Sequence, residues 1–142
     1  MTTTKRNTWQ REAVRARLTE AQGFVSARQL HAMLSAEGSS IGLATVYRNL
    51  AQLAEMGDAD SLQSPDGENL FRSCSSAGHH HHLICKRCGA AQELEAHAVE
   101  QWASEVGANY GFSDIEHVVD LFGVCESCRK EAQAAHKAIE AN

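Results

Sequence analysis

Two Cys-x-x-Cys pairs constrain the second half of this chain more than any other feature. The first pair is Cys85 and Cys88, the second is Cys125 and Cys128, and 36 residues lie between them. Four thiolates in this pairing are typical ligands of a structural zinc ion with tetrahedral geometry. Because the gap is longer than in compact zinc ribbons, regular secondary structure has to bring the pairs together. The pattern predicts strands at 79–85, 91–94 and 113–124, a helix at 98–106 and a closing helix at about 126–139.

Four consecutive histidines, His79 to His82, precede the first cysteine pair. The run is internal, which argues against a purification tag, and the apolar Leu83 and Ile84 that follow it indicate a strand. Successive side chains of a strand face opposite sides, so His79 and His81 point one way and His80 and His82 the other. One strand can therefore supply two imidazoles to each of two further metal sites.

Each histidine pair needs partners from elsewhere in the chain. Cys74 and Asp60 can complete a tetrahedral set with His80 and His82. A thiolate beside two imidazoles favours zinc over iron or manganese. For the other pair the chain offers two candidates, neither of which is demanded by local spacing: Glu100 and His117.

The first half of the chain predicts three helices and a hairpin. Thr8 is predicted to cap a helix over 9–21, and Ser26 with Gln29 forms a capping box for a second helix that ends at Gly38. A third helix fits 42–57, and strands at 59–63 and 69–73 flank a turn at 64–67. Three helices followed by a hairpin is the winged helix-turn-helix plan, whose third helix enters the major groove of DNA. A small helical domain with a merely solvated polar face fits the same helical pattern.

The charge distribution points to a localised polyanion-binding face. The net charge of −5 argues against a general nucleic-acid binder. Residues 1–50, however, carry seven Lys/Arg and three acids, a net charge of +4, so the remaining residues carry a net charge of −9. Chance clustering would give the same imbalance. The candidates for base or backbone contacts are Thr45, Tyr47, Arg48 and Asn49, and those for phosphate or minor-groove contacts are Arg11, Lys5 and Arg6.

Several classes of protein fit the sequence poorly. The N-terminus lacks the apolar core of a signal peptide and no apolar run approaches the ~20 residues of a membrane span, so we expect a cytoplasmic protein with reduced cysteines. A zinc hydrolase needs an open coordination position, whereas each site above has four ligands, so we expect no enzyme and no small-molecule substrate. A zinc-buffering protein would use the same ligands but has no need of the helix at 42–57.

Four segments of the chain carry a family resemblance: TWQREAV at 8–14, ATVYRNL at 44–50, HHHHLICKRCG at 79–89 and GVCESC at 123–128. Together they resemble the ferric uptake regulator (Fur) family of bacterial metal sensors, and within it the chain looks most like the zinc uptake regulator (Zur) branch. The resemblance implies an α+β protein with an N-terminal winged helix-turn-helix domain at 1–73, a hinge at 74–78 and a C-terminal α/β dimerisation domain at 79–142. It implies a homodimer that binds palindromic operator DNA when a regulatory metal occupies the hinge.

The Zur resemblance also implies three zinc sites per subunit. These are a structural site of Cys85, Cys88, Cys125 and Cys128, a hinge site of Asp60, Cys74, His80 and His82, and a third site of His79, His81, Glu100 and His117. Iron- and peroxide-sensing members instead take a hinge histidine from the second helix and an acid after the Cys-x-x-Cys, positions that fall on His31 and Glu93. Such members tend to have a carboxylate where Cys74 stands, which favours the Asp60 set. The resulting prediction is a zinc-dependent repressor of zinc-uptake genes, with a sibling sensor of nickel, iron or peroxide as the alternative.

Overall fold

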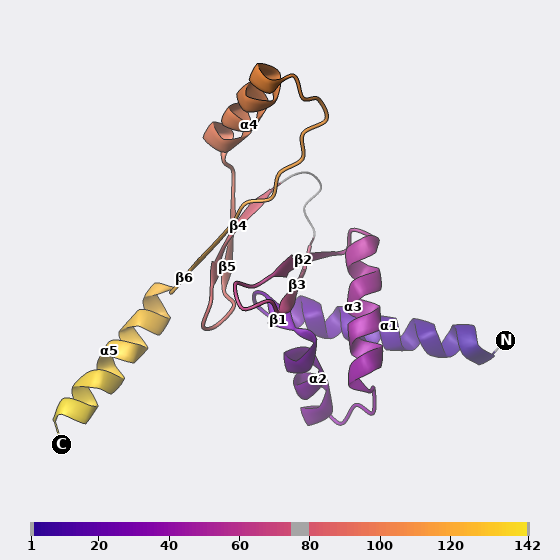
Figure 1. Cartoon of the computed structure of the whole chain (residues 1–142). Helices are drawn as coiled ribbons and strands as arrows, with labels where there is room; N and C mark the ends of the chain where they lie inside the picture. Colours follow the sequence, from indigo (N-terminus) through magenta and orange to yellow (C-terminus); the bar gives the residue numbers. More distant parts are fainter. Residues whose placement is uncertain (1, 75–79, 142) are drawn as a thin grey trace. The chain divides into compact units, whose positions relative to one another are not determined.

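The computed structural model describes residues 2–74 and 80–141, with side chains from residue 8 onward. The chain divides into two compact units, Met1–Ala77 and Gly78–Asn142 (Figure 1). Most of the expected hinge at 74–78, and His79 with it, lies outside the described residues. No helix of the described chain is long and apolar enough to cross a membrane.

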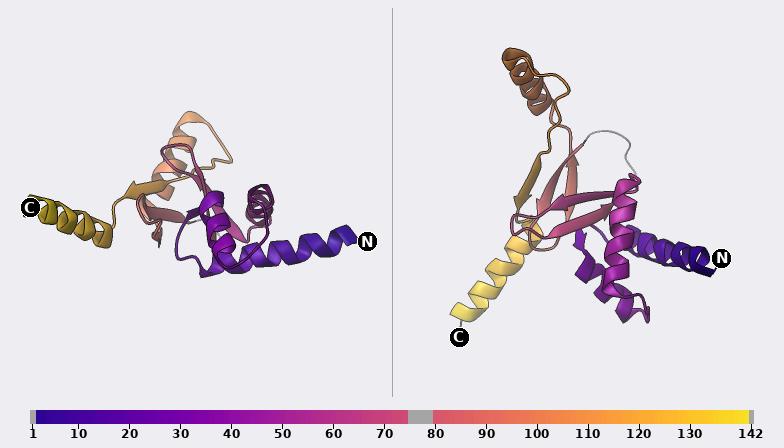
Figure 2. Two further views of the ribbon diagram at one scale, coloured as in Figure 1. Left: turned by 90° about the horizontal axis from the view of Figure 1, so that it is seen from below. Right: turned by 45° about the vertical axis from the view of Figure 1, so that its right-hand side comes forward.

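The first unit packs three helices against a small antiparallel sheet. Its elements are α1 (Thr2–Glu20), β1 (Val25–Ser26), α2 (Ala27–Ala36), α3 (Leu43–Glu55), β2 (Ala59–Gln63) and β3 (Asn69–Ser73), with the sheet order β1-β3-β2. Figures 1 and 2 show α1 crossing α3, with α2 packed beside both helices. Apolar side chains from all three helices and β3 form one buried core, which includes Val14, Leu18, Leu30, Leu34, Val46, Leu50, Leu53 and Phe71.

Local chemistry explains the boundaries of these elements. The Gln29 backbone N–H donates to Ser26 Oγ at 3.1 Å and the Ser26 N–H donates to Gln29 Oε1 at 2.9 Å, which confirms the predicted capping box. Gly38 and Gly57 follow α2 and α3 with φ of +89° and +80°, as predicted for helix stops. The prediction that Thr8 caps α1 is wrong, because α1 begins at Thr2 and no glycine or proline interrupts it upstream.

The second unit is built on the mixed sheet β5-β4-β6. Its elements are β4 (His81–Cys85), β5 (Ala91–Leu94), α4 (His97–Tyr110), β6 (Asp120–Gly123) and α5 (Glu126–Glu140). β4 pairs antiparallel with β5 and parallel with β6. The sequence of elements confirms the predicted α+β class, with a winged helix-turn-helix unit followed by an α/β unit.

Two predicted boundaries in this unit are wrong. α4 runs through to Tyr110, where Gly111 closes it with φ +76°. The predicted strand at 113–124 is extended only over β6, because the chain first has to return from α4. Asp114 takes a φ of +54° in that return, which is incompatible with a continuous strand.

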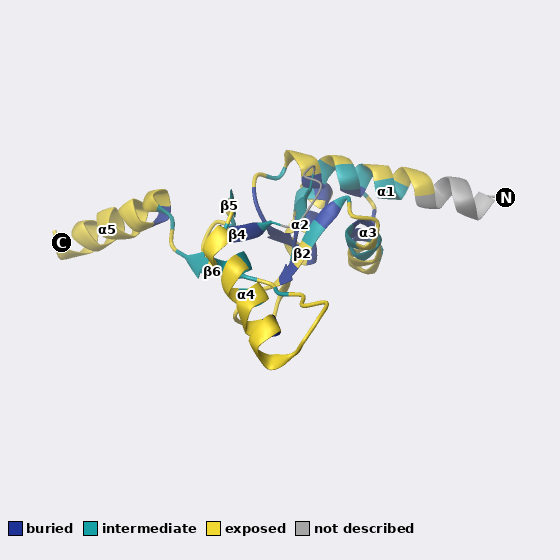
Figure 3. Cartoon of the chain, turned by 90° about the horizontal axis from the view of Figure 1, so that it is seen from above, coloured by how far each residue is buried: buried dark blue, intermediate teal, exposed yellow. Residues whose placement is uncertain are grey.

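The second unit has little apolar core of its own. Among its described residues, the apolar side chains that are buried are Ile84, Cys85 and Cys128, and of these only Ile84 is fully buried. Figure 3 shows α4 and α5 exposed along most of their length. The exposed apolar side chains of this unit include Trp102, Tyr110, Phe112, Val118, Leu121 and Ile139.

Candidate metal centres and DNA-binding face

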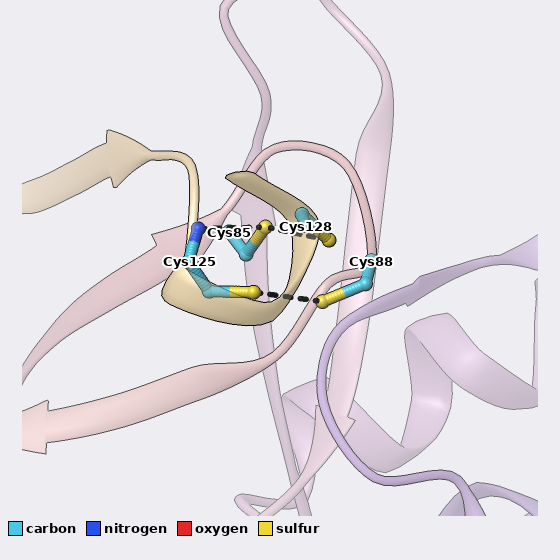
Figure 4. A group of neighbouring side chains, drawn as sticks. All are labelled: Cys85, Cys88, Cys125 and Cys128. Carbon is cyan, nitrogen blue, oxygen red and sulfur yellow. Dashed lines mark hydrogen bonds between the residues drawn. The ribbon is translucent and has the colours of Figure 1, made fainter. Parts of the chain in front are cut away.

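The four cysteines form a single cluster at one end of the second unit's sheet (Figure 4). Cys85 ends β4, Cys88 lies in the turn that follows, and Cys125 and Cys128 lie just before and within the first turn of α5. The Sγ atoms of Cys85 and Cys128 are 3.8 Å apart, as are those of Cys88 and Cys125. A tetrahedral zinc ion with Zn–S bonds of about 2.3 Å places its sulfurs about 3.8 Å apart, so the cluster has the size that zinc requires. None of the five cysteines forms a disulfide.

The thiols of this cluster differ in acidity. Burial raises the pKa of Cys85, but backbone N–H groups, that of Cys125 foremost, outweigh burial and lower it to about 6. Hydrogen bonding to the Cys125 thiol, followed by burial, raises the pKa of Cys128 to about 12. At neutral pH the protein alone therefore ionises only part of the set. Four adjacent thiolates need the positive charge of a bound metal ion.

A second donor cluster joins β4 to α4 and to the segment before β6. The Nε2 atoms of His81 and His117 lie 2.8 and 3.0 Å from the same Glu100 oxygen, Oε1. His81 is 3% exposed, so this oxygen-centred contact is shielded from water on the strand side. A tetrahedral zinc site with N/O ligands spaces its donors about 3.3–3.5 Å apart. A bound ion would therefore require only a small separation of the three groups.

A third donor cluster lies on the other side of β4. The ligand atoms of His80, His82 and Glu93 lie within 4.8 Å of one another. The two imidazole rings meet edge to face, with centroids 4.8 Å apart, and Glu93 is the antiparallel partner of His82. His81 thus faces one cluster and His80 and His82 the other, which is the alternation that strand geometry predicted. His79, the fourth expected member of the Glu100 cluster, lies outside the described residues.

Asp60 and Cys74 belong to the first unit, on its β2–β3 hairpin. Asp60 pairs with Arg72, and the Cys74 N–H donates to the Asp58 carbonyl at 3.1 Å, so the ladder continues one pair beyond β3. Because Asp60 and Cys74 are diagonal neighbours in this register, they occupy the same face of the hairpin. His31, the rival ligand, lies in α2 and is partly exposed.

The residues expected to contact DNA gather on α3 and the adjoining part of α1. Tyr47 is exposed, and its hydroxyl accepts a hydrogen bond from Asn69 Nδ2 at 3.2 Å, which fixes it against the hairpin. Arg48 is exposed beside it. Arg11 reaches the same face from α1, where its Nη2 donates to Gln52 Oε1 at 3.1 Å.

The other expected DNA contacts are placed differently. Asn49 is buried, and its Nδ2 donates to the Thr45 carbonyl at 2.9 Å, so it packs inward in this conformation. Thr45 itself is partly exposed on the α3 surface. Lys5 and Arg6 lie in α1, but their side chains are outside the described residues.

A match to a known protein family covers most of the chain. Residues 2–122 match the ferric uptake regulator family. The chain belongs to this family. A zinc uptake regulation protein of Mycobacterium tuberculosis is 45% identical over 87% of this chain and 95% of its own length. A ferric uptake regulation protein of Bacillus subtilis is 34% identical over 84% of this chain and 82% of its own length.

Solved structures of the family resemble the chain as well. A zinc uptake regulator complexed with zinc and DNA superimposes with a TM-score of 0.68 at 29% identity, covering 87% of this chain and 83% of that one. The ferric uptake regulator of Vibrio cholerae superimposes with a TM-score of 0.65 at 34% identity, covering 82% of this chain and 88% of that one. These Fur-family proteins share the winged-helix and α/β architecture described above.

One charged residue beside the third cluster was not anticipated from the sequence. Asp120, the first residue of β6, is the parallel partner of His82, and its Oδ1 lies 3.5 Å from His82 Nδ1. His82 and Asp120 are 38 positions apart in the chain. Only the β4–β6 pairing reveals their contact.

Proposed function

We propose that this Fur-family protein is a zinc-responsive transcriptional repressor, which binds palindromic operators of zinc-uptake genes when it is zinc-loaded. The observation that carries the proposal is the clustering of thiol, imidazole and carboxylate donors on both faces of β4, within a chain whose other unit is a winged helix-turn-helix. The 45% identity to a zinc uptake regulation protein supports zinc as the metal.

The donor chemistry supports three zinc sites of different kinds. The four-cysteine cluster fits a closed structural site. For the regulatory site we propose Asp60, Cys74, His80 and His82, because a thiolate with two imidazoles favours zinc. Glu93 is the rival of Cys74, since it already adjoins both imidazoles. For the third site we propose His79, His81, Glu100 and His117.

Regulation requires the hinge ligands to bind the same ion. Asp60 and Cys74 share one face of the hairpin that follows α3, while His80 and His82 belong to the second unit. Binding of all four donors to one ion would fix the orientation of the first unit, and with it the recognition helix α3. In a homodimer, the two α3 helices could then lie in successive major grooves, roughly 34–36 Å apart. A tenfold change in DNA affinity needs only ~1.4 kcal/mol of coupling, which is small beside the binding energy of zinc.

The second unit supports a homodimer. Its exposed Trp102, Tyr110, Phe112 and Val118 are 64%, 76%, 71% and 84% accessible, so much apolar surface remains to be covered. A second copy of the chain would bury such surface and would place two recognition helices on the two halves of a palindrome. We further propose that the protein acts in the cytoplasm and has no enzymatic activity.

The test is fluorescence anisotropy on a labelled promoter fragment of a zinc-uptake gene, with free Zn(II), Ni(II) and anaerobic Fe(II) each buffered separately. We expect tight binding with zinc alone. Activation by nickel or iron at a lower free concentration would identify a sibling sensor, for which the sulfur-free His80–His82–Glu93 cluster is the favouring observation. Zinc retention without DNA binding at any metal concentration would indicate a zinc-buffering protein.

Replacing Arg48 by alanine is expected to weaken operator binding by about 1–3 kcal/mol, because an exposed arginine on α3 is suited to base or phosphate contacts. Zinc content should stay at the wild-type value. The measurement is operator anisotropy together with metal analysis, and Arg129→Ala, at an exposed position on α5, serves as the matched control. Loss of zinc or of folding in Arg48→Ala would show that Arg48 is structural.

A further inference from the structure

Asp120 occupies a position from which it can act on a metal ligand without binding the metal. It begins β6 and lies directly opposite His82 in the parallel β4–β6 pair. The Asp120 Oδ1 and His82 Nδ1 atoms are 3.5 Å apart, and the two side chains are only 17% and 8% exposed. The contact is therefore a shielded one, in which water competes little for the imidazole nitrogen.

The geometry separates the two nitrogens of His82. Its Nδ1 faces Asp120, while its ring meets His80 edge to face in the cluster with Glu93. Asp120 is not a member of that cluster. In the cluster on the opposite face of β4, His81 and His117 likewise use Nε2 toward the shared donor, Glu100. A metal ion that bound His82 while Nδ1 stayed with Asp120 would have to bind through Nε2.

We propose that Asp120 is the positioning residue of the regulatory site: its carboxylate holds the proton of His82 on Nδ1 and so keeps the Nε2 lone pair directed at the metal. This inference rests on the proposed zinc-sensing function and deepens it. A carboxylate behind a metal-binding imidazole fixes the tautomer and the ring orientation and increases the basicity of the ligating nitrogen. Because β6 leads into Cys125, the same strand that positions His82 also leads into the four-cysteine cluster.

The experiment compares Asp120→Ala and Asp120→Asn with the wild type and with Glu131→Ala, a control acid at an exposed position on α5. Zinc affinity of the regulatory site is measured by chelator competition. We expect Asp120→Ala to weaken it about 10–100-fold. Asp120→Asn, which keeps an acceptor for Nδ1–H, should weaken it less, and Glu131→Ala should match the wild type. Zinc in the four-cysteine cluster, measured by metal analysis, should stay unchanged in all variants.

A second readout reports the tautomer directly. Nitrogen-15 NMR of metal-free protein should show His82 protonated at Nδ1 in the wild type and a shift toward the Nε2-protonated form in Asp120→Ala. Wild-type zinc affinity in Asp120→Ala, or Nε2 protonation of His82 in the wild type, would overturn the inference. A loss of zinc affinity in Asp120→Asn as large as that in His82→Ala would instead make Asp120 a direct ligand. Loss of the cysteine-bound zinc in both Asp120 variants would make Asp120 a structural residue.

Neither readout uses DNA, so the two proposals can fail separately. If wild-type protein binds zinc at His82 but shows no zinc-dependent operator binding, the repressor proposal fails and the role of Asp120 stands. If the wild type responds to zinc on DNA and Asp120→Ala behaves identically in both metal readouts, only the role of Asp120 fails.

Discussion

Replacing Cys128 by serine is expected to remove one zinc ion per chain and to unfold the second unit at room temperature, while the first unit remains folded. The reason is the distribution of apolar burial. The continuous core lies in the first unit, whereas Ile84, Cys85 and Cys128 are the buried apolar residues among those described in the second. A structural zinc ion contributes an apparent binding energy of about 10–16 kcal/mol, far more than so small a core.

Metal analysis after dialysis against a moderate chelator, and thermal unfolding followed by circular dichroism, test this expectation. The variant should lose the four-cysteine zinc and show residual helical signal from α1, α2 and α3 alone. Ser127→Ala is the matched control, because Ser127 is exposed beside Cys128 in the first turn of α5 and belongs to none of the donor clusters. A Cys128→Ser protein that retains its zinc and melts like the wild type would show that the second unit does not depend on the cysteine site.

Replacing His82 by alanine is expected to abolish zinc-activated operator binding without removing the four-cysteine zinc. His82 belongs to both ligand sets considered for the regulatory site, the one with Asp60 and Cys74 and the one with Glu93. Loss of a direct ligand should weaken zinc binding on the order of 100-fold or more, since even residues that only support a ligand contribute 10–100-fold. At fixed buffered zinc, operator affinity should then fall to the metal-free level.

The control for this variant is His136→Ala, an exposed histidine on α5 whose Nε2 contacts Glu140 at 3.1 Å. It should bind zinc and operator like the wild type. Cys74→Ser and Glu93→Gln then identify the remaining ligand, because only the true one should reproduce the His82→Ala phenotype. Full zinc activation in His82→Ala would place the regulatory site elsewhere, with the His81–Glu100–His117 cluster as the next candidate.

Features set by local chemistry were predictable from the sequence. The capping box at Ser26, the glycine stops and the bounds of β2 and β3 follow from a few neighbouring residues, and each prediction is confirmed. The opposite-face division of the histidines is also local, because the two-residue period of a strand dictates it. The inward packing of Asn49 was open to the same reasoning, since it lies three residues after Val46 and four before Leu53 on the apolar stripe of α3.

Features that depend on strand pairing over long separations were not predictable. The chain between Gly111 and Val119 contains β-branched and aromatic residues typical of a strand, yet its return from α4 requires an irregular path. The contact of His82 with Asp120 depends on the register between β4 and β6, which no local motif encodes. The clustering of the four cysteines was predictable because two Cys-x-x-Cys pairs are a spacing typical of a zinc site. A single aspartate has no such sequence pattern, so its contact with His82 was not predictable.

The order in which the elements follow one another along the chain also has a consequence for biosynthesis. The last strand of the first unit ends at Ser73, so this unit can fold while the ribosome is still adding the rest of the chain. The cysteine and Glu100 clusters require residues as late as Cys128 and His117. Metal binding at these two clusters therefore becomes possible only late in the synthesis of each chain. During zinc starvation, newly made chains would have a folded first unit and an incompletely folded second unit. Such chains would be open to proteolysis before they bind DNA.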